Sequence, residues 1–451
     1  MTYLPFTTKH TSDTILLTPH PIIFSSKKHH SLAVYLRSGF TISKAKFKKE
    51  PKLHGSEEEI IKQIHDIRFN EKNPYVITGG HFDQLFVRNL GIFFNALLDP
   101  RITTSHEDWT QRQEITLKTI ALDLEVFKQA GKDYTTIVHV KNNIFTGYNF
   151  YTRPSDSLFA ILYALCALTD DDFIGTVFPA KKLIKKKLQT QKAAKELYDN
   201  YKETLKHLIK TYLAEIIDEK TGLVKKTITL ASARDGIKRE SSFYDNVIAW
   251  ATIRLAKKLQ LYSMSDKEFE TWKKRIVKTF WDEKEGIFLD DLSKMSLEQK
   301  LFSADSFIVT STGFLDFSKN EERKYLSNMV TYVQKKRLDT PFPLHYSRND
   351  VPYKLYWQVR YFAPTYMGTS IWSHWGMEYI KALIYVGQFS EAKKQLDRYK
   401  QNIERYGGYP ELYDSNGNIL NSRLYHSVLH NGWVINYEQT KMLYDNLVSE
   451  E

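Results

Sequence analysis

The stretch Asp156-Ser-Leu-Phe-Ala-Ile-Leu-Tyr-Ala-Leu-Cys-Ala-Leu168 is apolar at almost every position, whereas the next long helical stretch, residues 191–217, is rich in Lys and Glu and carries one apolar stripe. An apolar stretch of this length predicts a helix that is buried on most sides. A single stripe predicts a helix that covers a core from outside. The two kinds of helix therefore belong to different layers of the fold.

The same alternation recurs about every 30 to 40 residues from Ser56 onward. The charged segments are residues 57–67, 106–130, 191–217, 266–280, 321–335 and 390–403. The apolar segments are residues 83–98, 156–168, 244–259, 304–311, 368–386 and 426–443. Six exposed helices, each followed by a buried one, predict an all-α fold in which an inner ring of six helices is enclosed by an outer ring, the (α/α)6 toroid.

Short β-like runs, such as Thr14-Ile-Leu-Leu-Thr18 and Ser31-Leu-Ala-Val-Tyr-Leu36, occur before the first helical segment. They predict a small, partly β N-terminal extension over residues 1–55. Everything after it reads as helix, so we expect one catalytic barrel over residues 56–451.

Composition narrows the classes of function. The net charge is +11, but the densest basic cluster, residues 181–187, has no interleaved aromatic residue, so we interpret it as a solvated surface and expect no nucleic-acid partner. Cys166 is the only cysteine, which excludes an intramolecular disulfide. Without a secretion signal or a membrane-length apolar stretch, we expect a cytoplasmic protein with no membrane partner. Metal, phosphate-loop and dinucleotide motifs are absent, which predicts chemistry without a cofactor or metal.

The inner helices of a toroid run parallel, so the segments that enter them gather at one mouth. These six entrances are rich in Asp, Arg, His and aromatic residues: residues 79–89, 152–158, 233–246, 302–305, 366–375 and 421–426. A single Asp at such a place is most simply an N-cap, because its carboxylate accepts backbone N–H bonds at the positive end of the helix. The prediction of a site therefore rests on the set.

Just before the last inner helix lies Tyr406-Gly-Gly-Tyr-Pro-Glu411-Leu-Tyr-Asp-Ser-Asn-Gly417, where Gly and Pro oppose helix formation. Glu411 stands between aromatic residues in this loop. Burying an unpaired carboxylate is expensive, so one held among rings usually has a partner or a task. The alternative is an exposed turn in which Glu411 is solvated and residues 414–417 only close a hairpin.

These segments resemble glycosidases of the alkaline and neutral invertase family and, more distantly, mannosylglycerate hydrolases and trehalases. Phe82-Asp-Gln-Leu-Phe-Val-Arg-Asn89 is similar to an early family segment, Asp156-Ser-Leu158 to the opening of an inner helix, and Tyr409-Pro-Glu-Leu-Tyr-Asp414 to a late loop. The resemblance covers roughly residues 80–440 and implies an (α/α)6 glycosidase that acts on a small saccharide.

By this resemblance Asp156 is the general acid and Glu411 the base or nucleophile, while Asp83, Gln84 and Arg88 contact the sugar. The other expected sugar contacts are entrance residues: Phe82, Tyr244, Trp372, His374, Trp375, Tyr413 and Tyr425. The chain departs from the family at Asn89, at Phe82 and at residues 243–246, which makes sucrose doubtful as the substrate. Asp235, in Ser232-Ala-Arg-Asp-Gly236, is a rival for the acid.

Hydrolysis of a glycoside needs one carboxyl that protonates the leaving oxygen and one that activates water or attacks the anomeric carbon. The resemblance implies an α-linked glucoside, mannoside or related saccharide and inversion, with the carboxyls about 6.5 to 9.5 Å apart. We therefore expect Asp156 and Glu411 to face each other across one pocket. Two alternatives stay open: a sugar epimerase that uses His374 and His426, and a toroid that binds carbohydrate without catalysis.

Overall fold

The computed structural model describes residues 6–10, 15–19, 21–26, 46–47, 50–69, 75–79, 84–102, 106–149, 153–170, 173, 191–233 and 236–448. Four sequence predictions lie outside this part of the chain: the basic cluster 181–187, the strand at 31–36, the site residues Phe82 and Asp83, and the rival acid Asp235.

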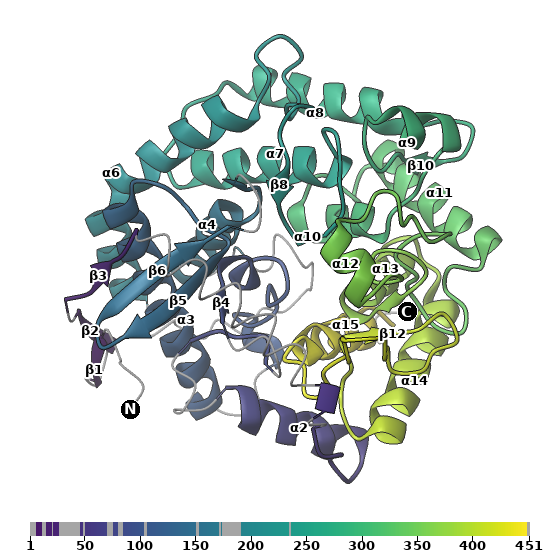
Figure 1. Cartoon of the computed structure of the whole chain (residues 1–451), viewed down its shortest axis with the longest axis horizontal. Helices are drawn as coiled ribbons and strands as arrows, with labels where there is room; N and C mark the ends of the chain where they lie inside the picture. Colours follow the sequence, from purple (N-terminus) through teal and green to yellow (C-terminus); the bar gives the residue numbers. More distant parts are fainter. Residues whose placement is uncertain are drawn as a thin grey trace.

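An outer ring of helices encloses an inner ring, as the alternation predicts (Figure 1). The outer helices are α2 (Glu57–Arg68), α3 (His106–Ala130), α6 (Gln191–Ile216), α8 (Asp266–Phe280), α11 (Asn320–Lys336) and α14 (Phe389–Tyr406). The inner elements are η1 (Val87–Leu90) with the turns that follow it, α4 (Ser157–Thr169), α7 (Phe243–Lys258), η3 (Ala304–Ile308) with α10 (Val309–Thr312), α13 (Ser373–Tyr385) and α15 (Val434–Val448).

The inner ring closes on itself through neighbouring contacts from η1 to α4, α7, η3, α13 and α15. Its first and last members are joined by the side-chain amide of Asn436, which donates to the carbonyl oxygen of Phe93 at 2.6 Å. The outer ring contacts the inner ring at the same place, because the Tyr437 hydroxyl of α15 donates a hydrogen bond to the Glu57 carboxylate of α2 at 2.8 Å. The toroid is therefore closed.

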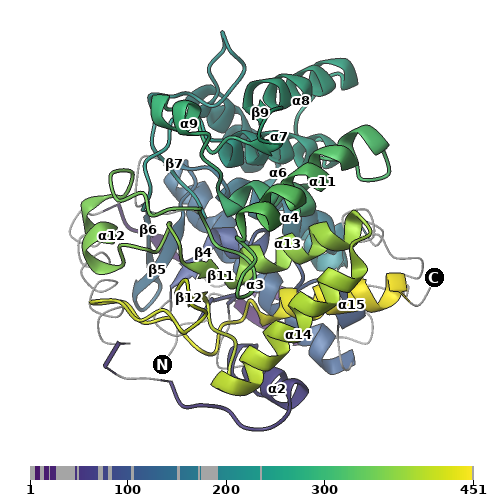
Figure 2. The same ribbon diagram turned by 90° about the vertical axis from the view of Figure 1, so that its right-hand side faces the viewer.

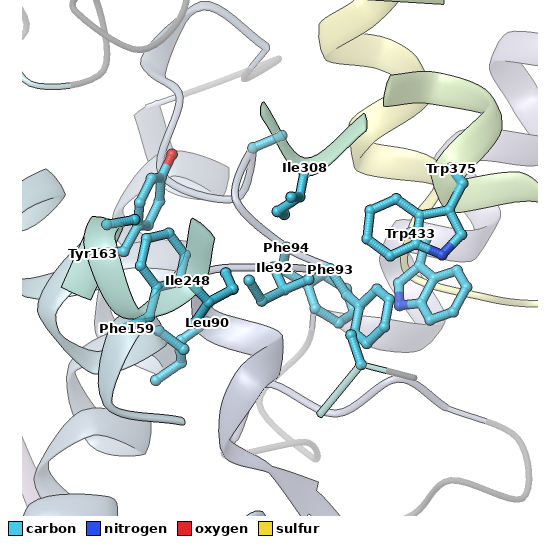
Figure 3. Packing of buried hydrophobic residues seen from close by; sticks show 14 of the residues in the cluster. Leu90, Ile92, Phe93, Phe94, Phe159, Tyr163, Ile248, Ile308, Trp375 and Trp433 are labelled. Carbon is cyan, nitrogen blue, oxygen red and sulfur yellow. The ribbon is translucent and has the colours of Figure 1, made fainter. Parts of the chain in front are cut away.

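The burial of side chains differs between the inner and the outer helices. Residues 157–168 of α4 are all buried, because α4 packs on α6, on α7 and on η1 at the same time. The outer helix α8 buries one face only and begins with a capping box of Ser265 and Glu268. The outer helix α3 departs from the predicted single stripe, because it packs on α4, on α6 and on two strands and is buried on most sides. Figure 3 shows the core at the ring centre, where Leu90, Ile92 and Phe93 of the first inner segment lie among side chains of the other inner helices.

Two inner members are not regular α-helices, which corrects the sequence prediction for residues 83–98 and 304–311. Residues 84–98 form β4 (Leu85–Phe86), η1 and a series of turns. Close packing is one reason, since a Cβ on Gly91 would lie 2.6 Å from the Cα of Ala160 in α4. The fourth inner member is the short pair η3 and α10, which ends at Gly313 with φ +65°.

The prediction that everything after residue 55 is helical was wrong for residues 136–148. Here β5 (Thr136–Lys141) and β6 (Ile144–Tyr148) form an antiparallel hairpin, with β4 paired to β5 and β3 (Ile23–Phe24) paired in parallel to β6. Asn142 turns the hairpin at φ 48°, a conformation that Asn tolerates well. The N-terminal segment also contains the hairpin of β1 (Phe6–His10) and β2 (Ile15–Pro19), and its strand β3 belongs to a sheet that the barrel region shares.

Short strands and α12 (Trp357–Phe362) gather on one side of the molecule, opposite the C-terminus (Figure 2). The strands include β7 (Arg153–Pro154), β8 (Leu230–Ala231), β11 (Ile371–Trp372) and β12 (Leu412–Tyr413). The remaining elements are η2 (Pro100–Ile102), α9 (Lys294–Gln299) and the pair β9 (Trp281–Asp282) and β10 (Ile287–Phe288). Every helix in the described part of the chain is too short or too polar to cross a bilayer.

Candidate active site

Asp156 occupies the N-cap position of α4, but its carboxylate does not cap the helix. It is fully buried, and its Oδ2 accepts hydrogen bonds from the backbone N–H of Ala233 at 2.6 Å and from the Tyr244 hydroxyl at 3.1 Å. The parallel pair β7 and β8 brings the second entrance beside the third and so places this carboxyl. Asp156 therefore faces the neighbouring entrance and not its own helix.

Arg88 reaches the same point from the first entrance. Its side chain donates to the carbonyl oxygen of Ser232, next to Ala233, and its guanidinium lies 5.3 Å from the ring centroid of Phe86. Gln84, on the same segment, is buried as well. Three entrances thus meet around Asp156.

Glu411 is buried in the late loop, with 2% of its surface exposed, so the alternative of a solvated turn was wrong. The helix α14 ends at Gly407, whose φ of +60° turns the chain toward β12, which pairs with β11. The backbone oxygen of Glu411 accepts from the N–H of Ser373 at 3.1 Å, at the start of α13. Asp414 does close the following turn, accepting from the N–H groups of Asn416 and Asn418.

Two tyrosine hydroxyls surround the Glu411 carboxyl. Tyr425 donates to Oε2 at 2.5 Å and Tyr366 donates to Oε1 at 3.4 Å. Burial raises the pKa of Glu411 to about 7, although both hydroxyls act in the opposite direction. This carboxyl therefore changes its charge near neutral pH.

A continuous set of ring contacts connects the surroundings of Asp156 with those of Glu411. We call it the aromatic belt; its members are Tyr244, Trp375, His374, Trp433, Trp372, Tyr366 and Tyr425, with successive ring centroids 4.6 to 6.3 Å apart. Tyr244 at one end binds Asp156, and Tyr366 and Tyr425 at the other end bind Glu411. Figure 3 shows Trp433 beside Phe93 of the first inner segment, with Trp375 in the same cluster.

The predicted His374 lies inside the belt as a buried, neutral ring. The His374 and Phe93 rings pack edge to face with their centroids 4.8 Å apart, and the Nδ1 of His374 is 3.3 Å from the side-chain amide nitrogen of Asn436. Burial lowers the pKa of His374 to about 3, so the imidazole is uncharged at neutral pH. Tyr413, another predicted contact, packs on Phe342 at 4.7 Å and on Tyr406 of α14, which places its ring between the loop and the outer layer.

Sequence reasoning did not select three further residues near the entrances: the half-buried Tyr366 and the buried Trp433 and Asp305. Tyr366 and Trp433 belong to the belt, yet a lone Tyr or Trp looks the same as any core ring in the sequence. Asp305 accepts from the hydroxyls of Tyr346 at 2.6 Å and Ser303 at 2.5 Å, and the Tyr346 ring lies 5.7 Å from Trp372. Asp305 could have been singled out, because it opens the fourth inner segment as Asp156 opens the second.

The described residues contain no group of three or more His, Cys, Asp or Glu side chains arranged to hold a metal ion. The described part of the site offers the buried carboxyls of Asp156, Asp305 and Glu411, tyrosine hydroxyls and aromatic rings. Such a set can transfer protons and hold a sugar ring.

No family model matches the sequence, and no curated protein matches it. Solved structures do match, and three glycosidases among them show the extent of the likeness. The rhamnosidase from Klebsiella oxytoca with rhamnose bound has a TM-score of 0.50 at 14% identity, over 88% of this chain and 66% of its own. The GH63 mannosylglycerate hydrolase from Thermus thermophilus in complex with Tris and D-glycerate has a TM-score of 0.51 at 13% identity, over 85% of this chain and 99% of its own.

The third is a metal-independent α-mannosidase from Streptococcus pneumoniae in a non-productive complex with α-1,6-mannobiose. Its TM-score is 0.52 at 12% identity, over 86% of this chain and 93% of its own. At such low identity the likeness concerns the fold alone. It confirms the (α/α)6 toroid that the alternation of helices predicts.

Proposed function

We propose that this chain hydrolyses an α-linked glucoside, mannoside or related small saccharide with a pair of carboxyls, and that it inverts the anomeric configuration. The observation that carries the proposal is the aromatic belt, which runs from the buried Asp156 to the buried Glu411 at the entrances of the inner ring. The likeness to glycosidases of the same fold supports it.

In this proposal Asp156 is the general acid. Both hydrogen bonds from Ala233 and Tyr244 go to Oδ2, which suits the carbonyl oxygen of a protonated carboxyl. Oδ1 is then the oxygen that carries the proton toward the leaving group. Asp235, the rival acid, is separated by one residue from Ala233 and becomes the acid if Asp156 only orders this loop.

Glu411 is the general base. A carboxyl with a pKa of about 7 is a stronger base than an ordinary carboxylate, and a base works best when its pKa is near the working pH. The hydroxyls of Tyr425 and Tyr366 hold its two oxygens in fixed directions, as a group that must aim one water at one carbon requires. Inversion is expected if that water fits between the two carboxyls.

The sugar itself is held by aromatic faces and by polar side chains of the first entrance. Of the belt, Tyr366 is half-buried and presents its ring to the C–H face of a sugar, while Trp372 and Trp375, 2% and 0% exposed, pack within the belt and hold the site in shape. Gln84 and Arg88 supply polar contacts, together with Phe82 and Asp83 by resemblance. We place the enzyme in the cytoplasm, with no nucleic-acid or membrane partner and no cofactor.

Neither alternative gains support from the site. An epimerase needs histidines that exchange protons near neutral pH, and His374 stays neutral because burial lowers its pKa to about 3. A toroid that only binds carbohydrate has no need of a buried carboxyl with a raised pKa.

The test is release of reducing sugar from a panel of α-glucosides, α-mannosides and α-rhamnosides, with α-1,6-mannobiose and mannosylglycerate included. We expect turnover of at least one α-linked member and none of the matching β-linked compounds. Binding is measured separately by calorimetry. Binding without turnover over the whole panel would contradict hydrolysis and favour the non-catalytic toroid.

A further inference from the structure

The helix α12 has no buried residue, although it carries a tryptophan and two other large aromatic side chains. Trp357 is 65% exposed and Tyr361 is 52% exposed. These two residues are four positions apart, so they lie on one face of the helix, and the exposed Arg360 lies between them. Large aromatic surface left in water in this way usually marks an interaction site.

The opposite face of α12 is anchored to the loop that binds Asp156. Val359 packs so closely on Gly236 that a Cβ there would lie 2.4 Å from Cγ2 of Val359. The N–H of Tyr356 donates to the carbonyl oxygen of Gly236 at 2.9 Å, and Ile237 forms a β-bridge with Leu355. The N-terminal end of α12 is therefore held at Gly236, which lies three residues along the chain from Ala233, the backbone donor to Asp156.

The other end of α12 is anchored to the loop that binds Glu411. The Ser422 hydroxyl donates to the carbonyl oxygen of Phe362, the last residue of α12, at 2.6 Å. Tyr425 follows Ser422 by three residues, and Tyr366 follows Phe362 by four; both bind the Glu411 carboxyl. The exposed face of α12 is thus held at the mouth between the two carboxyl loops, on the side shown in Figure 2.

This face is positively charged. The Arg423 guanidinium lies 5.1 Å from the ring centroid of Tyr361, and Lys238 lies 5.5 Å from the ring of Tyr356. Within the described ranges, Arg360, Arg423 and Lys238 form no ion pair with any carboxylate. Elsewhere on the surface many lysines do have acidic neighbours, such as Lys393 with Asp397 and Lys394 with Glu391.

We propose that Trp357, Arg360, Tyr361, Arg423 and Lys238, here called the α12 rim, bind the leaving-group end of an anionic oligosaccharide that extends out of the mouth. The inference rests on the proposed function for its direction, because the bond to be cleaved lies at the carboxyl pair. The rings stack on sugar faces, and the two guanidinium groups form charge-assisted bonds with an acidic substituent. That substituent is a uronate carboxylate or a phosphate.

Calorimetry with the whole chain tests the rim without requiring turnover. The carboxylate arm compares α-1,4-linked trigalacturonate with maltotriose, which has the same length and no charge. The phosphate arm compares glucose 6-phosphate with glucose. We expect the charged member of one pair to bind more tightly and to lose affinity as potassium chloride is added.

Two substitutions in the α12 rim and one control substitution show where the charged ligand binds. Trp357→Ala and Arg360→Gln should each weaken the preferred charged ligand about tenfold, the effect of losing one stacked ring or one charge-assisted bond. Arg323→Gln on the outer helix α11 removes the same charge from an exposed position and should change nothing. All three positions are exposed, so the variants are expected to fold.

The outcomes separate this inference from the proposed hydrolysis. Charge-dependent binding that both rim variants lose supports the rim, whether or not any glycoside is cleaved. Turnover of the panel together with equal binding of charged and neutral ligands would overturn the rim and leave the hydrolase intact. Charge-dependent binding that Trp357→Ala and Arg360→Gln leave unchanged would also overturn it.

Discussion

Asp156 and Glu411 are equally hidden from water but are held in different ways. Asp156 accepts one bond from a backbone N–H and one from a tyrosine on an inner helix. The Glu411 carboxyl accepts from two tyrosine hydroxyls, both on loops. A backbone N–H donor is lost only on substitution with proline and cannot rotate away from its partner, whereas a side-chain donor is easily removed by mutation and can rotate away. The two halves of the proposed pair should therefore respond differently to substitution.

The two carboxyls also differ in their proposed chemistry. A raised pKa alone suits a general acid as well as a base, so the roles assigned to Asp156 and Glu411 follow the resemblance of these two positions to a glycosidase family and not the pKa of Glu411. Glu411 lies among rings and loses its proton near pH 7. Asp156 presents one oxygen to two donors and is proposed to deliver a proton from the other. The following predictions test this division, from the largest expected effect to the smallest.

The largest effect should come from removing either carboxyl. Asp156→Asn and Glu411→Gln should each lower kcat by about 10² to 10⁴, the usual contribution of a general acid or base. With a p-nitrophenyl glycoside, whose leaving group needs little protonation, Asp156→Asn should recover most of its activity and Glu411→Gln should not. Asp414→Asn, in the same loop as Glu411, is the control and should stay close to wild type. Equal recovery of Asp156→Asn and Glu411→Gln on this substrate would contradict the assigned roles.

Glu411→Gln should also change stability in a pH-dependent way. The folded pKa of Glu411 is about 7 against a usual 4.5, so its contribution to stability is fully present below about pH 4.5 and is lost as the pH rises toward 7. Gln has no charge to bury. The variant should therefore gain up to about 3 kcal/mol relative to wild type between pH 4.5 and 7. Thermal unfolding of both proteins across this range measures it, and parallel curves would show that Glu411 ionises normally.

Tyr425→Phe should shift the pH profile. Its hydroxyl stabilises ionised Glu411, so its loss raises the pKa of Glu411 and moves the acidic limb of kcat/KM to higher pH. If the pKa of Glu411 rises by about one unit, kcat/KM falls about tenfold at pH values on the acidic limb and recovers at higher pH. Tyr366→Phe should also raise the pKa of Glu411 but by less, because the Tyr366 hydroxyl lies 3.4 Å from the carboxylate oxygen. A uniform loss at all pH values would mean that Tyr425 supports the loop only.

The smallest effect is expected at Tyr244→Phe. The Ala233 N–H still holds Asp156 after the hydroxyl is gone, and the remaining ring keeps its contact with Trp375, 6.2 Å away. We expect a loss of only several-fold in kcat, about 1 kcal/mol for one neutral hydrogen bond. A larger loss than in Tyr425→Phe would reverse the comparison between the two carboxyls.

Much of the fold could be predicted because each layer has its own pattern. The ranges of α3 and α8 match the predicted segments, and the Ser265 capping box marks the start of α8. The single apolar stripe predicted for both holds only for α8, because α3 is buried on most sides. The hairpin β5–β6 was missed although residues 136–148 carry β-branched and aromatic residues around an Asn-Asn turn. An expectation of continuous helix concealed that signal. The first inner segment is irregular because of close packing at Gly91, which no local pattern reveals.

The candidate site could be predicted only in part. The burial of Glu411 could be predicted because Gly and Pro mark its loop and rings flank it. The partner of the Asp156 carboxyl could not be found, because the N–H of Ala233 lies 77 residues away in sequence and any Asp before a helix reads as a cap. Tyr366 and Trp433 join the aromatic belt only once the ring closes.

The stereochemistry of the first product tests the pairing of Asp156 with Glu411 most directly. Proton NMR during hydrolysis of an α-linked substrate from the panel records which anomer is released before mutarotation. A general base across the pocket from the acid predicts that the β-anomer forms first and that Asp156→Asn and Glu411→Gln each slow its formation by about 10² to 10⁴. Initial release of the α-anomer, or β-anomer formation at the wild-type rate in either variant, would contradict the pair.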